Sequence, residues 1–146
     1  MSTALPAEGR LLAIDIGDKR IGLALSDPTQ MLAQPLGTLT RRGGKRFPLQ
    51  QLRIHLEAHR PTGVVVGLPL ESDGSEGDRA VEARRIGTHI ENKTGLPVCF
   101  HDERMTTARA LRAIKDLGGG TRGRKGEVDQ LAATTLLQSF LDGRQP

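Results

Sequence analysis

The order of the apolar segments along the chain limits the fold more than any other feature. Two short apolar runs, residues 11–16 and 21–26, stand on either side of a Gly-Asp-Lys turn, and this pattern predicts a β-hairpin. A third strand is expected at 36–40. The run 62–68 contains three consecutive valines, which is typical of a strand covered on both faces. A fifth strand is expected at 97–101.

Apolar residues at helical spacing separate or follow these strands. They predict helices at 46–59, 78–93, 106–117 and 127–141, and Pro61 closes the first of them. In the last helix we expect one apolar side, formed by Val128, Leu131, Ala132, Leu136 and Phe140. Three strands followed by alternating helices and strands indicate an α/β fold, a mixed five-stranded sheet with helices on both faces.

The length of 146 residues suits one compact domain, 1–146, in which the termini 1–9 and 143–146 are expected to be flexible. No stretch approaches the roughly 20 apolar residues that span a bilayer, and the first ten residues do not resemble a signal peptide. The single cysteine, Cys99, cannot form an internal disulfide. We therefore expect a cytoplasmic protein without a membrane partner.

Basic residues are clustered in two parts of a chain whose net charge is +4. Residues 41–60 hold six basic side chains against one acid, and residues 109–125 hold six against one. Such clusters attract polyanions, although a solvated basic surface explains them equally well. With three phenylalanines and neither tryptophan nor tyrosine, the chain lacks a stacking platform for single-stranded bases.

Acidic residues stand where predicted elements end. Asp15 interrupts an otherwise apolar strand, where a carboxylate needs a cation or a hydrogen bond to be buried, although it could also form a turn with its own backbone. Asp102 and Glu103 follow the last strand and should face opposite sides, and one of them could simply pair with Arg104. Asp129 falls in the first turn of the last predicted helix, where the helix dipole alone favours an acid.

Acids at the ends of several elements in a basic protein suggest a divalent-metal site. Mg²⁺ prefers oxygen ligands, and two such ions can activate water and stabilise the leaving oxygen in phosphodiester cleavage. Other sites are less well supported. The G-x-G-x-x-G at 118–123 follows a helix rather than a strand. His55 and His59 lack an evident third ligand, and Cys99 lacks a paired histidine.

Four motifs in order resemble the YqgF (RuvX) family of pre-16S rRNA nucleases. They are D-x-G-x-K-R-I-G from Asp15, V-V-G-L-P-L from Val65, D-E-R-x-T-T from Asp102 and D-x-x-A-A from Asp129. The resemblance covers about residues 11–141. It implies a ribonuclease H-like fold related to Holliday junction resolvases. It also implies that Asp15, Glu103 and Asp129 are catalytic acids that bind Mg²⁺ or Mn²⁺, and it favours Glu103 over Asp102.

The resemblance also implies a role in maturing the 5′ end of pre-16S rRNA during ribosome biogenesis. The expected partner is structured RNA or the pre-ribosome, with substrate phosphates held by Lys19, Arg20, Arg104, Arg124 and Lys125. Two alternatives remain open: a resolvase of branched DNA, and a nucleic-acid-binding assembly factor without cleavage. Resolution would need two active sites, so a homodimer favours it and a monomer does not.

Overall fold

The computed structural model describes residues 4–41, 46–105 and 125–144. Its centre is one five-stranded sheet with the order β3-β2-β1-β4-β5. Strands β1 (Leu11–Ile16), β2 (Arg20–Ser26) and β3 (Ala33–Thr40) form an antiparallel meander. Strands β4 (Gly63–Leu68) and β5 (Val98–Asp102) continue the sheet parallel to β1. The mixed five-stranded sheet expected from the sequence is confirmed.

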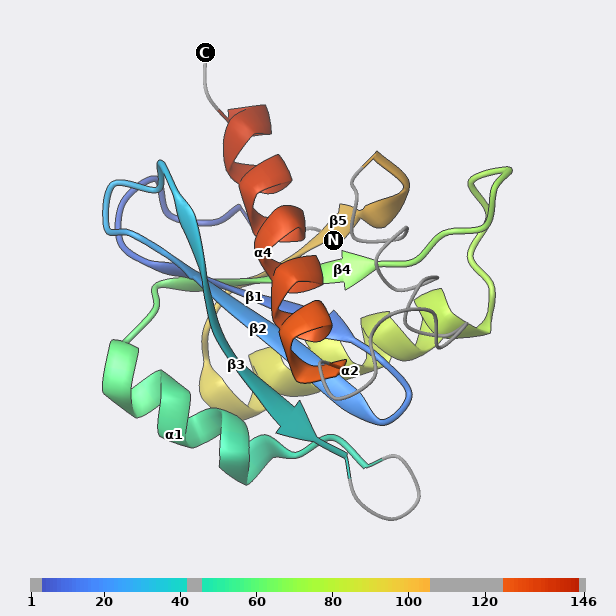
Figure 1. The fold of residues 1–146 in the computed structure, drawn as a ribbon, viewed down its shortest axis with the longest axis horizontal. Helices are drawn as coiled ribbons and strands as arrows, with labels where there is room; N and C mark the ends of the chain where they lie inside the picture. The colour runs from blue at the N-terminus through green and yellow to red at the C-terminus, as the bar shows by residue number, and fades with distance from the viewer. Residues whose placement is uncertain (1–3, 42–45, 106–124, 145–146) are drawn as a thin grey trace.

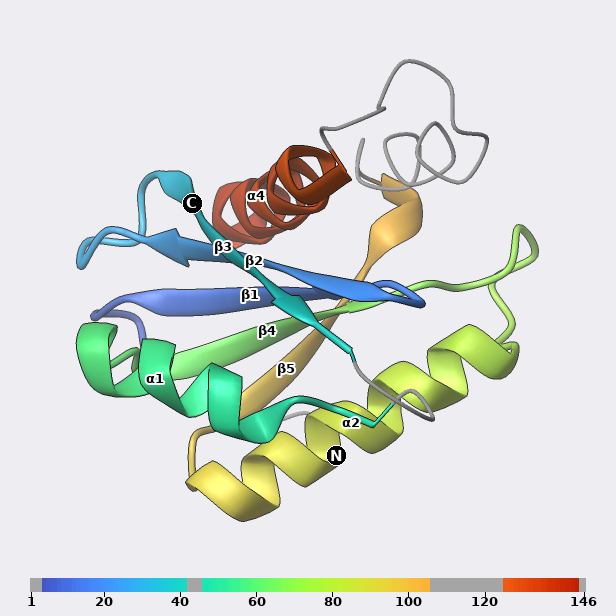
Figure 2. The same cartoon turned by 60° about the horizontal axis from the view of Figure 1, so that its bottom comes forward.

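Helices cover both faces of this sheet (Figures 1 and 2). Helix α4 (Lys125–Arg144) lies across β1, β2 and β3 on one face. Helices α1 (Leu49–His59) and α2 (Asp78–Thr94) lie on the other face. A short 3₁₀ helix, η1 (Glu103–Met105), follows β5 directly.

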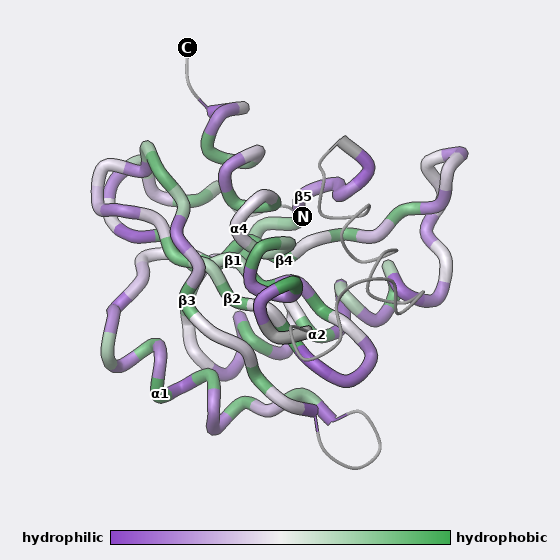
Figure 3. Tube along the Cα trace, viewed as in Figure 1, coloured by the Kyte–Doolittle hydropathy of each residue, from purple (hydrophilic) through white to green (hydrophobic). Residues whose placement is uncertain are grey.

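The alternation of side chains along each strand divides the core into two layers. Odd-numbered residues of β1, such as Leu11 and Ala13, pack with α4 in one buried cluster. Even-numbered residues, such as Leu12 and Ile14, join the cluster under α1 and α2. Figure 3 shows the matching pattern on the helices, where hydrophobic and hydrophilic residues alternate along α1. Residues 11–14 of β1 and all of β4 are buried, as expected for central strands covered on both sides.

Several element ends differ from the prediction, each for a local reason. Helix α1 begins at Leu49 instead of residue 46, because Pro48 lies at its N-cap and restricts the backbone of the residue before it. Strand β3 begins at Ala33, three residues before the predicted start, since its pairing with β2 extends to Ser26. Helix α4 begins at Lys125 and ends at Arg144, so it is longer at both ends than predicted. The predicted helix at 106–117 lies outside the described residues.

One expectation about burial is wrong. Leu131 is 49% exposed, because α4 turns Ala132, Ala133 and Leu136 toward the sheet instead. In the segment before β1, Leu5 is buried in the cluster beneath α4. Arg144 donates a hydrogen bond to the Leu5 carbonyl at 2.9 Å, which ties the segment before β1 to the end of α4.

Candidate active site

Three acidic side chains are buried among the described residues. Asp15 on β1 is 4% exposed, Glu103 at the start of η1 is 1% exposed, and Asp129 on α4 is 3% exposed. A carboxylate is rarely buried to this extent unless it is paired or binds a cation, because burial removes its hydration. These are the three acids that the sequence motifs singled out, and they belong to elements far apart in the chain.

A glycine on β2 brings Asp129 to Asp15. Gly22 is the residue opposite Asp15 in the antiparallel register of β1 and β2. A Cβ built on Gly22 would overlap the Asp129 carbonyl oxygen and lie 3.2 Å from the Asp129 Cβ. The main chain of α4 therefore packs directly on the sheet at the position beside Asp15. Glycine within a strand often marks such a close approach of two backbones.

A second glycine, on β4, makes room for Glu103 on the other side of Asp15. The parallel register pairs Ile14 with Val66, and one further step places Gly67 beside Asp15. A Cβ built on Gly67 would overlap the Glu103 Oε1 and lie 3.1 Å from the Glu103 Cδ. Facing positions on neighbouring strands are about 5 Å apart. On the α4 face of the sheet, Asp15 thus lies between Gly22 and Gly67. Asp129 lies over Gly22, and the Glu103 carboxylate lies over Gly67.

The side chains of Asp102 and Glu103 face opposite sides of the sheet, as strand alternation predicts. Asp102 pairs in register with Leu68, whose side chain belongs to the core beneath α1 and α2. The Asp102 carboxylate accepts hydrogen bonds from the Arg104 side chain, at 2.9 Å from Nη2 and at 3.1 and 3.2 Å from Nε. These bonds hold the pKa of Asp102 below its usual value. Asp102 therefore pairs with Arg104, and Glu103 alone turns to the face where Asp15 lies.

The position of Asp129 on α4 weakens the explanation that the helix dipole alone favours an acid there. Because α4 begins at Lys125, Asp129 lies one turn inside the helix, and Glu127 is the acid in the first turn. The helix dipole acts mainly on the first turn. Ala132 and Ala133, one turn further along, are buried, so the small side chains let α4 pack close to the sheet as predicted.

Arg20 on β2 forms an ion pair with Asp129. Its Nε donates to Asp129 Oδ2 at 2.8 Å, and the side chains are 24% and 4% exposed. Sequence reasoning missed this contact because the two residues are 109 positions apart. Arg20 was expected to hold substrate phosphate, and in this structure its guanidinium contacts a candidate catalytic acid.

A buried arginine fixes the turn that follows Asp15, and sequence reasoning missed it too. The Arg41 side chain is 1% exposed, and its Nη1 donates to the Gly17 carbonyl at 2.9 Å. The same guanidinium contacts Glu82 on α2 at 3.3 and 3.4 Å. Arg41 therefore links the end of β3, the turn after β1 and the helix beneath it.

The three buried carboxylates are chemically suited to bind a hard divalent cation. Asp15, Glu103 and Asp129 supply carboxylate oxygens, which Mg²⁺ and Mn²⁺ prefer. Within the described residues, no three His, Cys, Asp or Glu side chains are grouped closely enough to hold an ion. Mg²⁺ is commonly held by only one or two carboxylates, with water and substrate phosphates completing its shell. Asp15 and Glu103 offer two such carboxylates, and Asp129 is paired with Arg20.

The other basic residues predicted to bind phosphate are distributed unevenly. Lys19 is exposed in the turn after β1. Arg104 is partly exposed and contacts the loop before α2, donating to the Ser72 carbonyl at 3.3 Å. Arg124 lies outside the described residues, and so does the side chain of Lys125.

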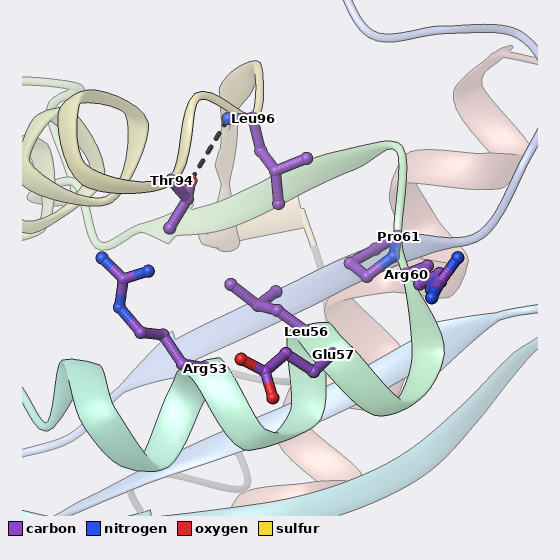
Figure 4. Close-up of a pocket in the computed structure, with 7 residues that line it drawn as sticks. All are labelled: Arg53, Leu56, Glu57, Arg60, Pro61, Thr94 and Leu96. Carbon is purple, nitrogen blue, oxygen red and sulfur yellow. Dashed lines mark hydrogen bonds between the residues drawn. The ribbon is translucent and has the colours of Figure 1, made fainter.

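The remaining candidate sites lie elsewhere. The rings of His55 and His59 stack on α1 with centroids 6.5 Å apart, and burial lowers the pKa of His55. Burial raises the pKa of the Cys99 thiol, which does not favour a nucleophile. A pocket with mixed charge lies beside the amino ends of β4 and β5, away from the three acids (Figure 4). It is lined by Arg53, Leu56, Glu57, Arg60, Pro61, Thr94 and Leu96.

The chain is similar to known proteins along nearly its whole length. The model of the RuvX family, described as Holliday junction resolvase, matches residues 9–143. The chain belongs to the RuvX family. A protein of Lactococcus lactis subsp. cremoris named "Putative pre-16S rRNA nuclease" is 40% identical over 136 residues, covering 91% of this chain and 94% of the relative. A Roseiflexus protein of the same name is 38% identical over 137 residues, covering 94% and 96%.

A solved structure confirms the fold. RuvC of T. thermophilus in complex with a Holliday junction substrate matches with a TM-score of 0.51 at 19% identity, covering 93% of this chain and 95% of that one. The ribonuclease H-like fold expected for a RuvX protein is therefore confirmed. Membership of the family also confirms the enzyme class, a nuclease that hydrolyses phosphodiester bonds. Among the described helices of this RuvX protein, none is long and apolar enough to cross a membrane.

Proposed function

We propose that this RuvX protein is a divalent-metal-dependent nuclease of structured RNA that matures the 5′ end of pre-16S rRNA in the cytoplasm. The convergence of Asp15, Glu103 and Asp129 carries the proposal. All three are buried, and two strand glycines beside Asp15 admit the other two acids to the same face. The names of the relatives support this substrate.

Asp15 and Glu103 would hold the cation, and Asp129 would complete its protein ligands. Mg²⁺ or Mn²⁺ bound there supplies a Lewis acid that activates water and stabilises the leaving oxygen. Asp15 is positioned on a rigid central strand, and Glu103 on the short helix that follows β5. Positioning on such elements favours precise geometry at the scissile bond. Lys19, Arg20, Arg104, Arg124 and Lys125 would contact the phosphates around it.

The deciding experiment is cleavage of a pre-16S rRNA 5′ fragment with Mn²⁺ or Mg²⁺. Wild type should cut, and Asp15→Asn, Glu103→Gln and Asp129→Asn should each lose at least 100-fold in rate, since each removes one charged oxygen ligand. Glu57→Gln is the control, because it neutralises an exposed acid that lines the pocket in Figure 4, away from the three acids. Equal activity in Asp15→Asn and wild type would refute the assignment, as would cleavage that survives a chelator.

Branched DNA is a second candidate substrate. The description of the family as Holliday junction resolvase favours it. A four-way junction in the same assay, with sedimentation analysis of the protein, separates the two substrates. Resolution needs two cuts and therefore favours a homodimer. Binding without cleavage of either substrate would instead favour an assembly factor.

A further inference from the structure

Arg20 already contacts one of the carboxylates that the proposed metal site requires. Its Nε lies 2.8 Å from Asp129 Oδ2, and the Asp129 side chain is only 4% exposed. Hydrogen bonds between a guanidinium and a carboxylate are short and strong, and shielding from water strengthens the attraction further. In this structure the buried charge of Asp129 is balanced in part by a cation of the protein itself.

The two partners differ in how firmly they are held. The Asp129 main chain packs against Gly22 on β2, so its Cα cannot move without shifting α4. Arg20 lies two residues before Gly22 and therefore on the same face of β2. Its guanidinium stands at the end of a flexible side chain that is 24% exposed. The backbone that carries the carboxylate is fixed, whereas the guanidinium can leave.

We propose that Arg20 is a resident counter-ion, which holds Asp129 until a divalent cation takes the carboxylate in its place. The inference rests on the proposed function, because it takes Asp129 as a ligand. Two cations at one buried carboxylate repel each other strongly. A divalent cation that takes Asp129 Oδ2 therefore has to displace the guanidinium, and the strength of the ion pair lowers the affinity of the site for that cation.

The placement of the other acids agrees with this exchange. No three metal-binding side chains are grouped for one ion within the described residues. Asp129 points one of its oxygens at Arg20, and the Glu103 carboxylate lies over Gly67, on the far side of Asp15 from Gly22. Rearrangement of the Arg20 side chain is the smallest change that frees Asp129 Oδ2 for a ligand role.

The test is calorimetric titration of the full chain with Mn²⁺ alone, without nucleic acid. Arg20→Gln keeps a polar side chain but removes the charge, so it should bind Mn²⁺ about tenfold more tightly than wild type. Arg84→Gln is the matched control, since Arg84 forms a 2.7 Å ion pair with Glu76 outside the site. It removes the same net charge and should bind as wild type does.

A double-mutant cycle identifies the cause of any gain. In the Asp129→Asn background, Arg20→Gln should no longer tighten Mn²⁺ binding, because the pair is already broken. Arg20→Lys, a milder change that keeps the charge, should lie between wild type and Arg20→Gln, and circular dichroism checks that each variant is folded. Unchanged or weaker binding in both Arg20 variants overturns the proposal. An equal gain in Arg84→Gln, or a gain that persists with Asp129→Asn, overturns it too.

Failure of the counter-ion role can be distinguished from failure of the proposed function. If the cycle behaves as expected but no RNA is cut, the counter-ion role stands and the nuclease assignment to RNA falls. If wild type cuts RNA and Arg20→Gln binds Mn²⁺ no more tightly, the function stands and the counter-ion role falls. Absence of Mn²⁺ binding in every variant overturns the counter-ion role.

Discussion

Gly22 lies opposite Asp15 on β2, and the main chain of Asp129 packs directly on it. The important property of Gly22 is that it has no side chain. Any Cβ at Gly22 would meet the Asp129 carbonyl, which belongs to a helix backbone and cannot turn away. A strand glycine is ordinarily a weak point of a sheet, and here it sets the distance between α4 and the candidate site.

Gly22→Ala should therefore lower both stability and activity. We expect a loss of about 2–3 kcal/mol, because overpacking must move α4 away from the sheet. Gly143→Ala is the matched control, since a Cβ there meets nothing within 4 Å and alanine is the better helix former. Urea unfolding and the RNA cleavage rate measure the two effects. Equal stability of the two variants would contradict the close packing.

Arg41 acts at the scale of elements, because it joins β3, the turn after β1 and α2. Arg41→Ala removes the donor to the Gly17 carbonyl and a partner of Glu82. We expect a loss of about 2–3 kcal/mol, because a buried guanidinium and its hydrogen bonds are lost together. Arg85→Ala provides the comparison: Arg85 also contacts Glu82, but at 3.9 Å and with a 65% exposed side chain.

The Arg85 variant should change stability by less than about 0.5 kcal/mol, as surface ion pairs usually do. Both variants can be compared by urea unfolding under the same conditions. Similar losses in Arg41→Ala and Arg85→Ala would show that burial of Arg41 does not matter.

The Asp27 carboxylate binds several donors in the connection between β2 and β3. Asp27 accepts hydrogen bonds from the backbone nitrogens of Leu32 and Met31 and from Thr29, and these bonds hold its pKa far below the usual value. A pKa lowered by folding means that the stabilisation is complete above the unfolded pKa of about 3.9 and is lost as the pH falls below it.

Asp27→Asn should therefore lower the thermal midpoint by a few degrees at pH 7, and the difference from wild type should shrink at pH 3. Thermal unfolding of both proteins at the two pH values measures this. A difference that is the same at pH 3 as at pH 7 would mean that the Asp27 charge does not hold the loop.

For the whole molecule, the net charge of +4 makes contact with nucleic acid dependent on salt. Affinity for the RNA fragment, measured with chelator to prevent cleavage, should fall at least tenfold between 50 and 200 mM salt. Lys19 is exposed in the turn after the strand that carries Asp15. Lys93 is exposed near the end of α2, next in sequence to Thr94, which lines the pocket in Figure 4.

Lys19→Gln should therefore reduce the slope of log affinity against log salt by about one, and Lys93→Gln should leave it unchanged. Both changes remove one exposed positive charge, so only position distinguishes them. An equal effect of the two substitutions would indicate binding to the overall charge of the protein rather than to the side that carries the acids.

The sequence by itself determined the sheet and the order of the described elements, because apolar periodicity separates strands from helices. Local patterns also pointed to acids at the ends of these elements, and the resemblance of four motifs to a known family selected Asp15, Glu103 and Asp129 among them. Strand alternation also separated Asp102 from Glu103 correctly. Element ends were predicted less well, because Pro48 and the pairing of β3 with β2 changed them.

Only the tertiary structure decided how the acids meet and what contacts them. The close approach of Asp129 to Gly22, the pairing of Arg20 with Asp129 and the burial of Arg41 join residues that are far apart in sequence. Such contacts depend on how α4 and α2 pack against the sheet, and neither apolar periodicity nor motif spacing predicts that packing. A pattern along the chain can therefore name the acids, but the geometry that gives them a common face exists only once the helices are in place.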